Sequence, residues 1–208
     1  HEAHGVTIRE GVGLERLTGD THVTGAELSD GTTLDVDFVI VGVGIGAATA
    51  LADAAGIVND NGIMTDSHGR TSAPHVWAAG DCASFPYRGG RIRLESVPNA
   101  IDQAELVAEN IMGADKEYVA KPWFWSDQYD VKLQIAGLNM GYDRVITRCS
   151  DADSVAFWYY RGDELLAVDA MNDPRGFMIG RRLIEAGKSP APALIEDPNT
   201  DLKALLKS

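Results

Sequence analysis

The sequence predicts an α/β region followed by a small α+β domain. Three observations support this fold class. Short alternating strands lead into an apolar run at 38–41 and a helix at 47–55. A second helical pattern covers 98–112, with a proline in its first turn. After a change of composition near 114–122, four strand-like runs precede one long helix. Period-two and period-3.6 patterns are typical of strands and helices, respectively.

The first 41 residues are expected to form short strands. Residues 5–10 alternate apolar and polar side chains, and Asp30 and Gly31 lie between two further alternating runs. Asp-Gly between such runs is a strong hairpin signal. Residues 38–41 are wholly apolar, as in a strand that is covered on both faces. We therefore expect an antiparallel meander joined to one buried strand.

The glycines after this run raise the question of a phosphate site. Gly42, Gly44 and the helix at 47–55 match the loose dinucleotide fingerprint, in which a helix N-terminus faces a pyrophosphate. Gly56 ends that helix early, and residues 57–70 indicate a loop and a hairpin instead of a second parallel strand. Two interpretations remain. The glycines either hold a pyrophosphate or let the backbone pass close to a ligand.

Residues 76–79 are apolar and predict a short strand, which Gly80 and Asp81 close. Ligands of open α/β sheets bind beyond the carboxyl ends of the strands. A carboxylate at that edge can accept hydrogen bonds from sugar-alcohol hydroxyls, and Gly80 lets the backbone come close to the ligand. The alternative is that Asp81 only caps the next turn.

The helix predicted over 98–112 has Ile101, Ala104, Ala108 and Ile111 at helical spacing. The composition change that follows is taken as a domain boundary. The last part is predicted as a small α+β domain with these elements: strands near 131–136, 144–149, 154–161 and 164–171, a helix at 174–188, and a tail at 197–208 that is a capped short helix or an ordered coil.

Composition limits the classes of function. The 208 residues carry a net charge of −13, which argues against nucleic-acid partners and anionic membranes. Residues 1–115 hold 6 Lys and Arg against 17 Asp and Glu, whereas 116–208 hold 12 against 14. The second part is therefore the better candidate for meeting an acidic partner.

Cysteine and histidine usage predicts no metal site. Cys82 and Cys149 are isolated, without a CxxC pair, and the five histidines have no ligand spacing. Two isolated cysteines suit a reducing compartment, so a cytoplasmic location is expected. No signal peptide and no apolar run of membrane-spanning length is present, so no membrane association is expected.

Four stretches of the sequence together resemble a known family. They are RTSAPHVWAAGDCA, RIRLESVPNAIDQAELVAENIMG, PWFWSDQYDVKLQIAGL and MNDPRGFMIGRRLIEAGK. In this order and spacing they resemble the FAD-dependent NAD(P)H:ferredoxin reductases of bacterial oxygenase systems. The resemblance covers nearly all of residues 5–205.

The resemblance implies a partial FAD/NAD(P)-binding α/β fold followed by a C-terminal α+β interface domain. Residues 1–41 would end the NAD(P)-binding domain, 42–115 would form the second segment of the FAD-binding domain, and 116–208 would form the interface domain. The glycine motifs that bind FAD and NAD in the family are absent from this sequence, which also lacks an initiating Met. We therefore expect a fragment or a split polypeptide.

The resemblance also assigns cofactor contacts. Asp81 would hydrogen-bond the ribityl chain of FAD, with Gly80 permitting the approach, and Val97 would offer its backbone N–H to the pyrimidine edge of the flavin. Trp125 would lie near the isoalloxazine, and Glu95 near the nicotinamide. The sequence leaves a structural alternative for each of the last three residues. Val97 could pack in the core, and Trp125 could join an aromatic cluster with Trp123 and Phe124. Glu95 could form a surface ion pair with Arg91 or Arg93.

One departure from the family concerns the opening glycines. Many relatives have a Pro-Asn pair shortly after the second glycine, where this sequence has Gly46, Ala47 and Ala48. Side-chain contacts there are not expected, whereas Gly42 and Gly44 retain a backbone role beside the nicotinamide or flavin.

The implied function is electron transfer from NAD(P)H through FAD to an iron–sulfur ferredoxin that serves an oxygenase. Basic side chains near the last long helix would steer an acidic ferredoxin, or they are simply solvated. They are Arg175, Arg181, Arg182 and Lys188. Two alternatives stay open, a disulfide-reductase-like or other NADH:acceptor flavoprotein, and a non-catalytic interface or assembly module. The chain alone is expected to hold no cofactor tightly and to self-associate as a dimer.

Overall fold

The computed structural model describes residues 1–207, which divide into two units, residues 1–45 and the rest of the chain from residue 46. The first unit contains a 3-10 turn η1 (Glu2–His4) and the strands β1 (Leu14–Gly19), β2 (Val23–Leu28) and β3 (Thr33–Asp35). The strands form an antiparallel sheet in the order β1-β2-β3. An antiparallel meander is therefore present, but its first strand is β1 instead of the predicted run at residues 5–10.

The hairpin between β2 and β3 follows the chemistry of its turn. Asp30 Oδ1 accepts a hydrogen bond from the backbone N–H of Thr32 at 2.9 Å. Gly31 has a φ of 83°, a left-handed conformation that glycine adopts without steric cost. The Asp-Gly signal identified the turn correctly.

Two expectations for this unit are wrong. Residues 5–10 form no strand, and neither do residues 38–41. Phe38, Ile40 and Val41 are 72%, 85% and 68% exposed. An apolar run becomes a buried strand only when neighbouring strands pair with its backbone and other layers cover its faces. The sheet of this unit ends at β3.

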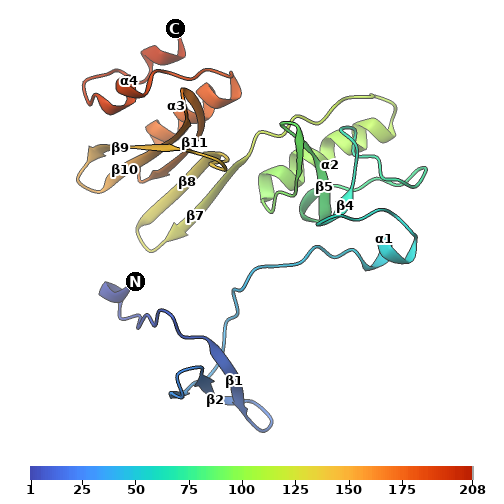
Figure 1. The fold of residues 1–208 in the computed structure, drawn as a ribbon, viewed down its shortest axis with the longest axis vertical. Helices are drawn as coiled ribbons and strands as arrows, with labels where there is room; N and C mark the ends of the chain where they lie inside the picture. Colours follow the sequence, from blue (N-terminus) through green and yellow to red (C-terminus); the bar gives the residue numbers. More distant parts are fainter. Residues whose placement is uncertain (208) are drawn as a thin grey trace. The chain divides into compact units, whose positions relative to one another are not determined.

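The second unit begins with the α/β part of the chain. Its elements are α1 (Ala50–Ala54), β4 (Ile63–Met64), the 3-10 turn η2 (Gly80–Cys82), β5 (Ala83–Tyr87), β6 (Gly90–Ile92) and α2 (Val97–Ile111). β4 pairs with β5 in parallel, and β5 pairs with β6 antiparallel. Figure 1 shows α2 beside this small sheet.

The strand predicted over residues 76–79 is wrong. Trp77 forms only an isolated bridge with Arg70, and the strand begins instead at Ala83, after Gly80 and Asp81. The Thr71 hydroxyl accepts a hydrogen bond from the backbone N–H of Ala73 and donates to the carbonyls of Ala73 and Val76. This local hydrogen bonding competes with a strand ladder.

The predicted apolar stripe of α2 is exposed. Ile101 and Ile111 are 52% and 55% exposed, whereas the buried residues of the helix are Pro98, Asn99, Gln103, Val107 and Asn110. Three of these five carry amides whose hydrogen bonds compensate their burial. The helix therefore packs through a hydrogen-bonded polar face.

The C-terminal domain is a five-stranded antiparallel sheet with helices on one face (Figure 1). Its strands are β7 (Trp123–Gln128), β8 (Val131–Gly137), β9 (Arg144–Asp151), β10 (Ser154–Arg161) and β11 (Glu164–Met171), in the order β7-β8-β11-β10-β9. The helical elements are α3 (Pro174–Glu185), α4 (Pro192–Glu196) and η3 (Ala204–Leu206). The four predicted strands and the long helix are confirmed, and β7 is an additional strand.

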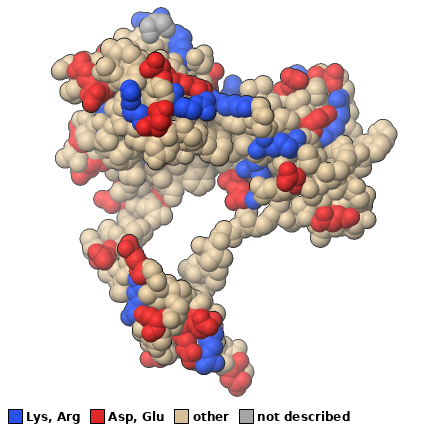
Figure 2. Space-filling model, in the orientation of Figure 1, with Lys and Arg blue, Asp and Glu red and all other residues tan. Residues whose placement is uncertain are grey.

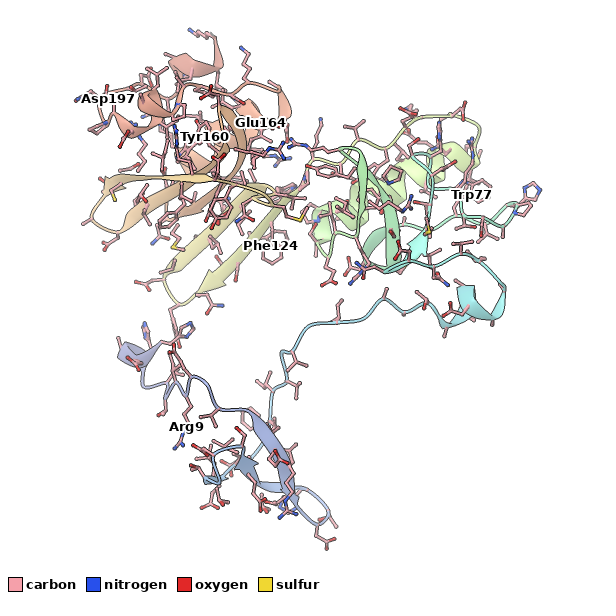
Figure 3. All side chains as sticks on the ribbon, in the orientation of Figure 1. Arg9, Trp77, Phe124, Tyr160, Glu164 and Asp197 are labelled. Atoms are coloured by element: carbon pink, nitrogen blue, oxygen red, sulfur yellow. The ribbon has the colours of Figure 1, made fainter. Side chains whose placement is uncertain are left out.

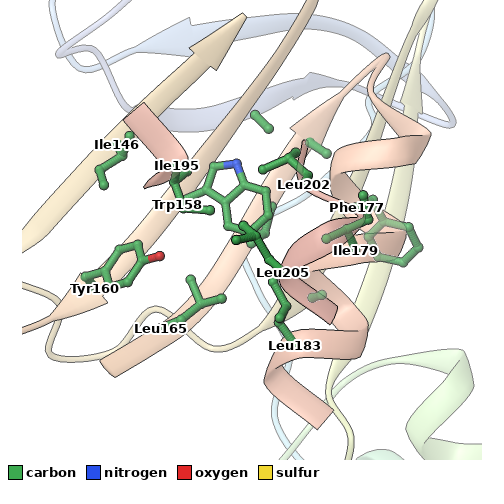
Figure 4. Packing of buried hydrophobic residues seen from close by; sticks show 14 residues of the cluster. Ile146, Trp158, Tyr160, Leu165, Phe177, Ile179, Leu183, Ile195, Leu202 and Leu205 are labelled. Atoms are coloured by element: carbon green, nitrogen blue, oxygen red, sulfur yellow. The ribbon is translucent and has the colours of Figure 1, made fainter. Parts of the chain in front are cut away.

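The core of this domain surrounds Trp158 and Tyr160, both with no exposed surface. Alternate residues of β10 point into it, because successive side chains of a strand face opposite sides. Figure 4 shows Leu183 of α3, Ile195 of α4 and Leu205 of the tail around Trp158. The helices and the tail thus cover one face of the sheet.

Candidate functional site

The turn at Gly80 is the part of the predicted site that the backbone defines most sharply. Gly80 is buried with a φ of 78°, and its N–H donates to Gln103 Oε1 at 2.8 Å. A Cβ at this position would lie 3.4 Å from the Cβ of Ala100. Positive φ and this close packing against α2 both favour glycine. The next side chain, Asp81, is exposed.

The N-terminus of α2 lies directly after a short loop from β6. Ser96 caps it by accepting a hydrogen bond from the backbone N–H of Asn99 at 3.3 Å. Val97 is the first helical residue and is 59% exposed. The first backbone N–H groups of a helix have no acceptor within the helix, so they remain available to a ligand. The alternative of core packing for Val97 is inconsistent with this exposure.

Arg93 joins the two predicted acidic residues, although sequence reasoning gave it no role at the cofactor. Its Nη1 donates to the backbone carbonyl of Asp81 at 3.2 Å and forms an ion pair with Glu95. The side chain is only 10% exposed, and its Nε is buried without a hydrogen-bond partner among the described residues. An orphaned guanidinium N–H beside an exposed carboxylate is consistent with a site for a polar ligand.

The partner of Glu95 is therefore Arg93 and not Arg91. Arg91 donates instead to the carbonyls of Thr65 and Ser84 and so ties β6 to neighbouring chain. The alternating order Arg91, Arg93, Glu95 was the available sequence signal, since residues two apart share one face of an extended segment.

A cavity of about 290 Å³ lies between the loop before α2 and the C-terminal domain. Glu95 and Ser96 line one side, and Trp123 and Phe124 of β7 line another. Figure 3 shows Phe124 at the side of the C-terminal domain that faces α2. The size approaches the lower end of the range for small-molecule sites.

Asp169 of β11 also lines this cavity and was not identified from the sequence. Burial raises its pKa, and this effect is opposed by a hydrogen bond of 2.9 Å from the Tyr159 hydroxyl. The pKa of Tyr159 is raised to about 12, first by burial and then by Asp169. No local motif marks either residue, because the strand pairing of β10 with β11 brings them together.

Trp125 lies on β7, outside the residues that line the cavity. Its ring stacks on that of Trp123 with centroids 5.5 Å apart, and Phe124 packs nearby at 6.4 Å. The predicted aromatic cluster is present, yet Trp125 is 43% exposed. The indole therefore combines a packed edge with a surface that a further group can contact.

Gly42 and Gly44 belong to the first unit, unlike the other predicted site residues. Both are exposed, and a Cβ on either would meet nothing within 4 Å. Gly44 has a φ of 89°, which glycine tolerates well. Gly80, Asp81, Glu95 and Val97, in contrast, are brought together through Arg93 and Gln103.

The possible metal-ligating side chains of residues 1–207 do not cluster. That part of the chain contains no group of three or more His, Cys, Asp or Glu side chains arranged for a metal ion. Cys82 and Cys149 are free thiols, the first half-buried and the second exposed. No helix in the same residues combines the length and the apolar character needed to cross a bilayer.

Comparison with known proteins places these features in a family. The family model described as pyridine nucleotide-disulphide oxidoreductase matches residues 1–104, which is half of the chain. The chain belongs to the pyridine nucleotide-disulphide oxidoreductase family. A second model, described as reductase C-terminal, matches residues 123–206 of the chain. The predicted fold class is therefore confirmed.

Curated relatives are similar to this chain along nearly all of its length. It is 43% identical over 100% of its residues to a ferredoxin–NAD(P)(+) reductase from a Sphingomonas species, and 41% identical over 99% to putidaredoxin reductase from Pseudomonas putida. The chain spans about half the length of these curated relatives, 50% of each.

Solved structures agree. The chain matches a ferredoxin reductase from Rhodopseudomonas palustris with a TM-score of 0.91 and 40% identity, covering 98% of this chain and 51% of that one. It matches the covalent putidaredoxin reductase–putidaredoxin complex with a TM-score of 0.92 and 39% identity, covering 99% and 51%.

Proposed function

We propose that the whole protein moves electrons from NAD(P)H through FAD to an iron–sulfur ferredoxin that serves an oxygenase. The observation that carries this proposal is similarity to ferredoxin reductases in both parts of the chain. Identity of 41% with putidaredoxin reductase extends over 99% of the residues, including the C-terminal domain. A solved neighbour of the same kind is covalently joined to its putidaredoxin.

The domain roles follow from the same similarity. Residues 1–41 are proposed as the end of an NAD(P)-binding domain, 42–115 as a segment of an FAD-binding domain, and 116–208 as an interface domain for the electron acceptor. FAD would supply the ability to take two electrons together and release them singly. The protein would bind and orient the FAD and exclude water from it.

The residues around Gly80 are proposed to contact FAD. The exposed Asp81 carboxylate is proposed to accept hydrogen bonds from ribityl hydroxyls, and Gly80 leaves the backbone free of a side chain. Arg93, whose Nε is buried and unpartnered among the described residues, holds the backbone of Asp81 and pairs with Glu95. We assign Arg93 to positioning both acids.

The start of α2 supplies electrostatic stabilisation. The N–H of Val97 is proposed to face the pyrimidine edge of the flavin, where negative charge develops on reduction. A helix N-terminus carries partial positive charge and favours an anion there. The hydrogen bonds of Ser96 and Asn99 fix this end of the helix.

The remaining predicted residues have proposed roles at the rim. Glu95 would position the nicotinamide, and the backbone of Gly42 and Gly44 would pass beside the nicotinamide or flavin. Trp125 would pack on the isoalloxazine and limit water access, because its ring is half-exposed yet held by Trp123.

The decisive experiment is FAD binding and turnover by the complete protein. Asp81→Ala should weaken FAD binding roughly tenfold or more, because a charge-assisted hydrogen-bond acceptor is removed. Glu105→Ala changes an exposed acid of α2 and serves as the matched control. Flavin release would be measured by fluorescence, and reduction of a [2Fe–2S] ferredoxin by NADH would be followed by absorbance. A complete protein without NADH-dependent ferredoxin reduction would contradict the proposal.

Ferredoxin docking is proposed for the basic side of the C-terminal domain. Arg182 of α3 is exposed, whereas Arg175 and Arg181 are paired with Asp201 and Glu185. Figure 2 shows a row of basic side chains across this domain, with acidic ones beside it. Charges of this kind raise association rates at low salt.

The alternative of a non-catalytic interface module has its own test. The exposed apolar face of α2, with Ile101 and Ile111, favours self-association of the chain as a dimer. We also propose that the 208-residue chain does not retain FAD and is cytoplasmic. Sedimentation should show a dimer, and the double variant Ile101→Gln and Ile111→Gln should weaken it. A purified chain that is yellow and holds stoichiometric FAD would contradict the cofactor prediction.

A further inference from the structure

A second cavity, of about 510 Å³, has no part in the proposed function. It lies between the β5–β6 turn, the connecting segment 118–122 and the C-terminal domain. It shares only Pro122 and Gly137 with the cavity beside Glu95. Its volume is in the range of small-molecule sites.

Three glycines form part of the cavity wall. Gly137 has a φ of 77°, and a Cβ there would lie 2.1 Å from the carbonyl oxygen of Leu166. No other residue fits at that position, so this wall is backbone plus the methyl group of Ala136. Gly89 and Gly90 form part of another wall and likewise leave space.

Two tyrosines give the cavity an aromatic character. The hydroxyl of Tyr118 is already committed, since it donates to Asn99 Oδ1 at 2.8 Å. Burial raises the pKa of Tyr87, and within residues 1–207 its hydroxyl has no hydrogen-bond partner. Pro86 and Ile184 add apolar surface. A flat apolar group would fit these walls, and Tyr87 could donate to it.

The charge of the lining is positive. Arg88, Lys121 and Arg181 face the cavity with Glu185 as the acid, and Glu185 is paired with Arg181 at 2.7 Å. In the part of the chain that the structure describes, Lys121 has no acidic partner within ion-pair distance. Arg88 is only weakly paired, because the acid that it contacts, Glu164, is also held by Arg161.

Glu164 is shared between two arginines. Arg161 holds one of its oxygens at 2.6 Å, whereas Arg88 contacts the other at 3.5 Å. Figure 3 shows Glu164 at the edge of the C-terminal domain that faces the β5–β6 segment. Arg88 and Lys121 are therefore the cations available to an anionic ligand.

We propose that this cavity binds a small planar aromatic carboxylate. Its ring would pack against Tyr87 and Tyr118, and its carboxylate would pair with Lys121 and Arg88. Inorganic phosphate would leave the aromatic walls unused, and a neutral aromatic would leave the cations unpaired. The site is separate from the proposed cofactor contacts and does not depend on the proposed electron transfer.

The probe for the test is 2-naphthoate, with 2-naphthamide as its neutral counterpart and inorganic phosphate as the bare anion. Calorimetry or saturation-transfer NMR should show saturable binding of 2-naphthoate that weakens with salt. The amide should bind roughly three- to tenfold more weakly, the effect of a partly exposed ion pair. Phosphate should not compete.

Two variants locate the binding. Lys121→Gln with Arg88→Gln should weaken 2-naphthoate binding roughly three- to tenfold and leave 2-naphthamide unchanged. Lys132→Gln, an exposed lysine of β8 outside the cavity, is the matched control. Gly90→Leu narrows the cavity at a position where a Cβ meets only the Tyr87 carbonyl, at 3.8 Å, and should reduce binding of both probes.

Circular dichroism would establish that each variant is folded. The proposal is overturned if 2-naphthoate shows no saturable binding. It is equally overturned if the amide binds as tightly, if phosphate displaces the naphthoate, or if Lys132→Gln weakens binding as much as the double variant does.

Discussion

At the scale of single residues, Arg148 of β9 makes four hydrogen bonds to the backbone of the C-terminal segment. Its Nη1 donates to the carbonyls of Ile195 and Asp197 at 2.9 and 2.7 Å, and its Nη2 to those of Pro198 and Thr200 at 3.0 Å each. Four carbonyls of one irregular segment are thus satisfied by one planar guanidinium. Its fixed fork of donors suits this role, which a lysine ammonium cannot reproduce.

Arg148→Lys should therefore lower the free energy of unfolding by about 1–3 kcal/mol, because several hydrogen bonds to a charged donor are lost. Urea denaturation measures the change, and limited proteolysis should show cleavage near residues 197–201. Arg144→Lys, exposed on the same strand, is the control and should have little effect. Equal stability of the two variants would show that the tail is held by other contacts.

Tyr160 predicts an alkaline sensitivity. Burial raises its pKa from 10.0 to about 12, and its hydroxyl donates to the carbonyl of Pro190 at 3.0 Å. Because the folded-state pKa is raised, the stabilising contribution is present below pH 10 and is lost as the pH rises toward 12.

Urea denaturation between pH 8 and 11, together with the near-ultraviolet absorbance of phenolate, tests this prediction. Wild-type stability should fall above about pH 10, and Tyr160→Phe should show a smaller fall. Tyr129→Phe, an exposed tyrosine, should retain the wild-type profile. Identical slopes for all three proteins would contradict the assignment.

At the scale of elements, α2 reverses the usual relation between polarity and burial. Gln103 is 1% exposed and its Oε1 accepts the N–H of Gly80 at 2.8 Å, while Ile101 on the same helix is 52% exposed. The helix thus holds the Gly80 turn through an amide. Its apolar stripe is left for a further contact.

Gln103→Met should destabilise the protein by about 1–3 kcal/mol, because the buried N–H of Gly80 loses its acceptor. Ile101→Gln should leave the free energy of unfolding of the monomer, measured at low protein concentration, nearly unchanged, since the side chain is exposed there. Thermal unfolding of both variants measures the difference. A larger loss for Ile101→Gln than for Gln103→Met would show that the exposed stripe is covered by other chain.

At the scale of the whole molecule, the C-terminal domain has a core of its own. The clustered buried residues run from Ala136 to Leu205, with Trp123, Ile184 and Leu206 packed against them. No member of this cluster among the described residues comes from before residue 123. A domain with a complete core can fold alone.

A fragment of residues 116–208 should therefore unfold cooperatively and keep the near-ultraviolet circular dichroism of its buried tryptophan. Trp158→Ala should abolish that folding, because replacing a fully buried tryptophan costs about 3–5 kcal/mol. Trp125→Ala, which removes a half-exposed tryptophan, is the comparison. A fragment with non-cooperative unfolding would show that the α/β part is needed.

Much of the fold follows from local patterns in the sequence. The strands near 144–149, 154–161 and 164–171 and the helix from residue 174 were predicted because each has a clear period and turn residues at its ends. Of the predicted site residues, Gly80 and Asp81 had a local signal in the strand-like run before them, whereas Glu95 and Val97 came from the family resemblance. The structure brings these four residues near one another, and their contact with a cofactor stays a prediction.

The sequence by itself determined most elements of the C-terminal domain, the turn chemistry at Gly31, and the resemblance that indicates a reductase. Only the tertiary structure decided which of the other strand-like runs become strands, that residues 38–41 are exposed, and that Asp169 meets Tyr159. It also decided that Arg93 pairs with Glu95 and that the β5–β6 turn and the connecting segment line a cavity. The physical reason is that periodicity is read within one segment, whereas burial and pairing depend on segments far apart in the chain.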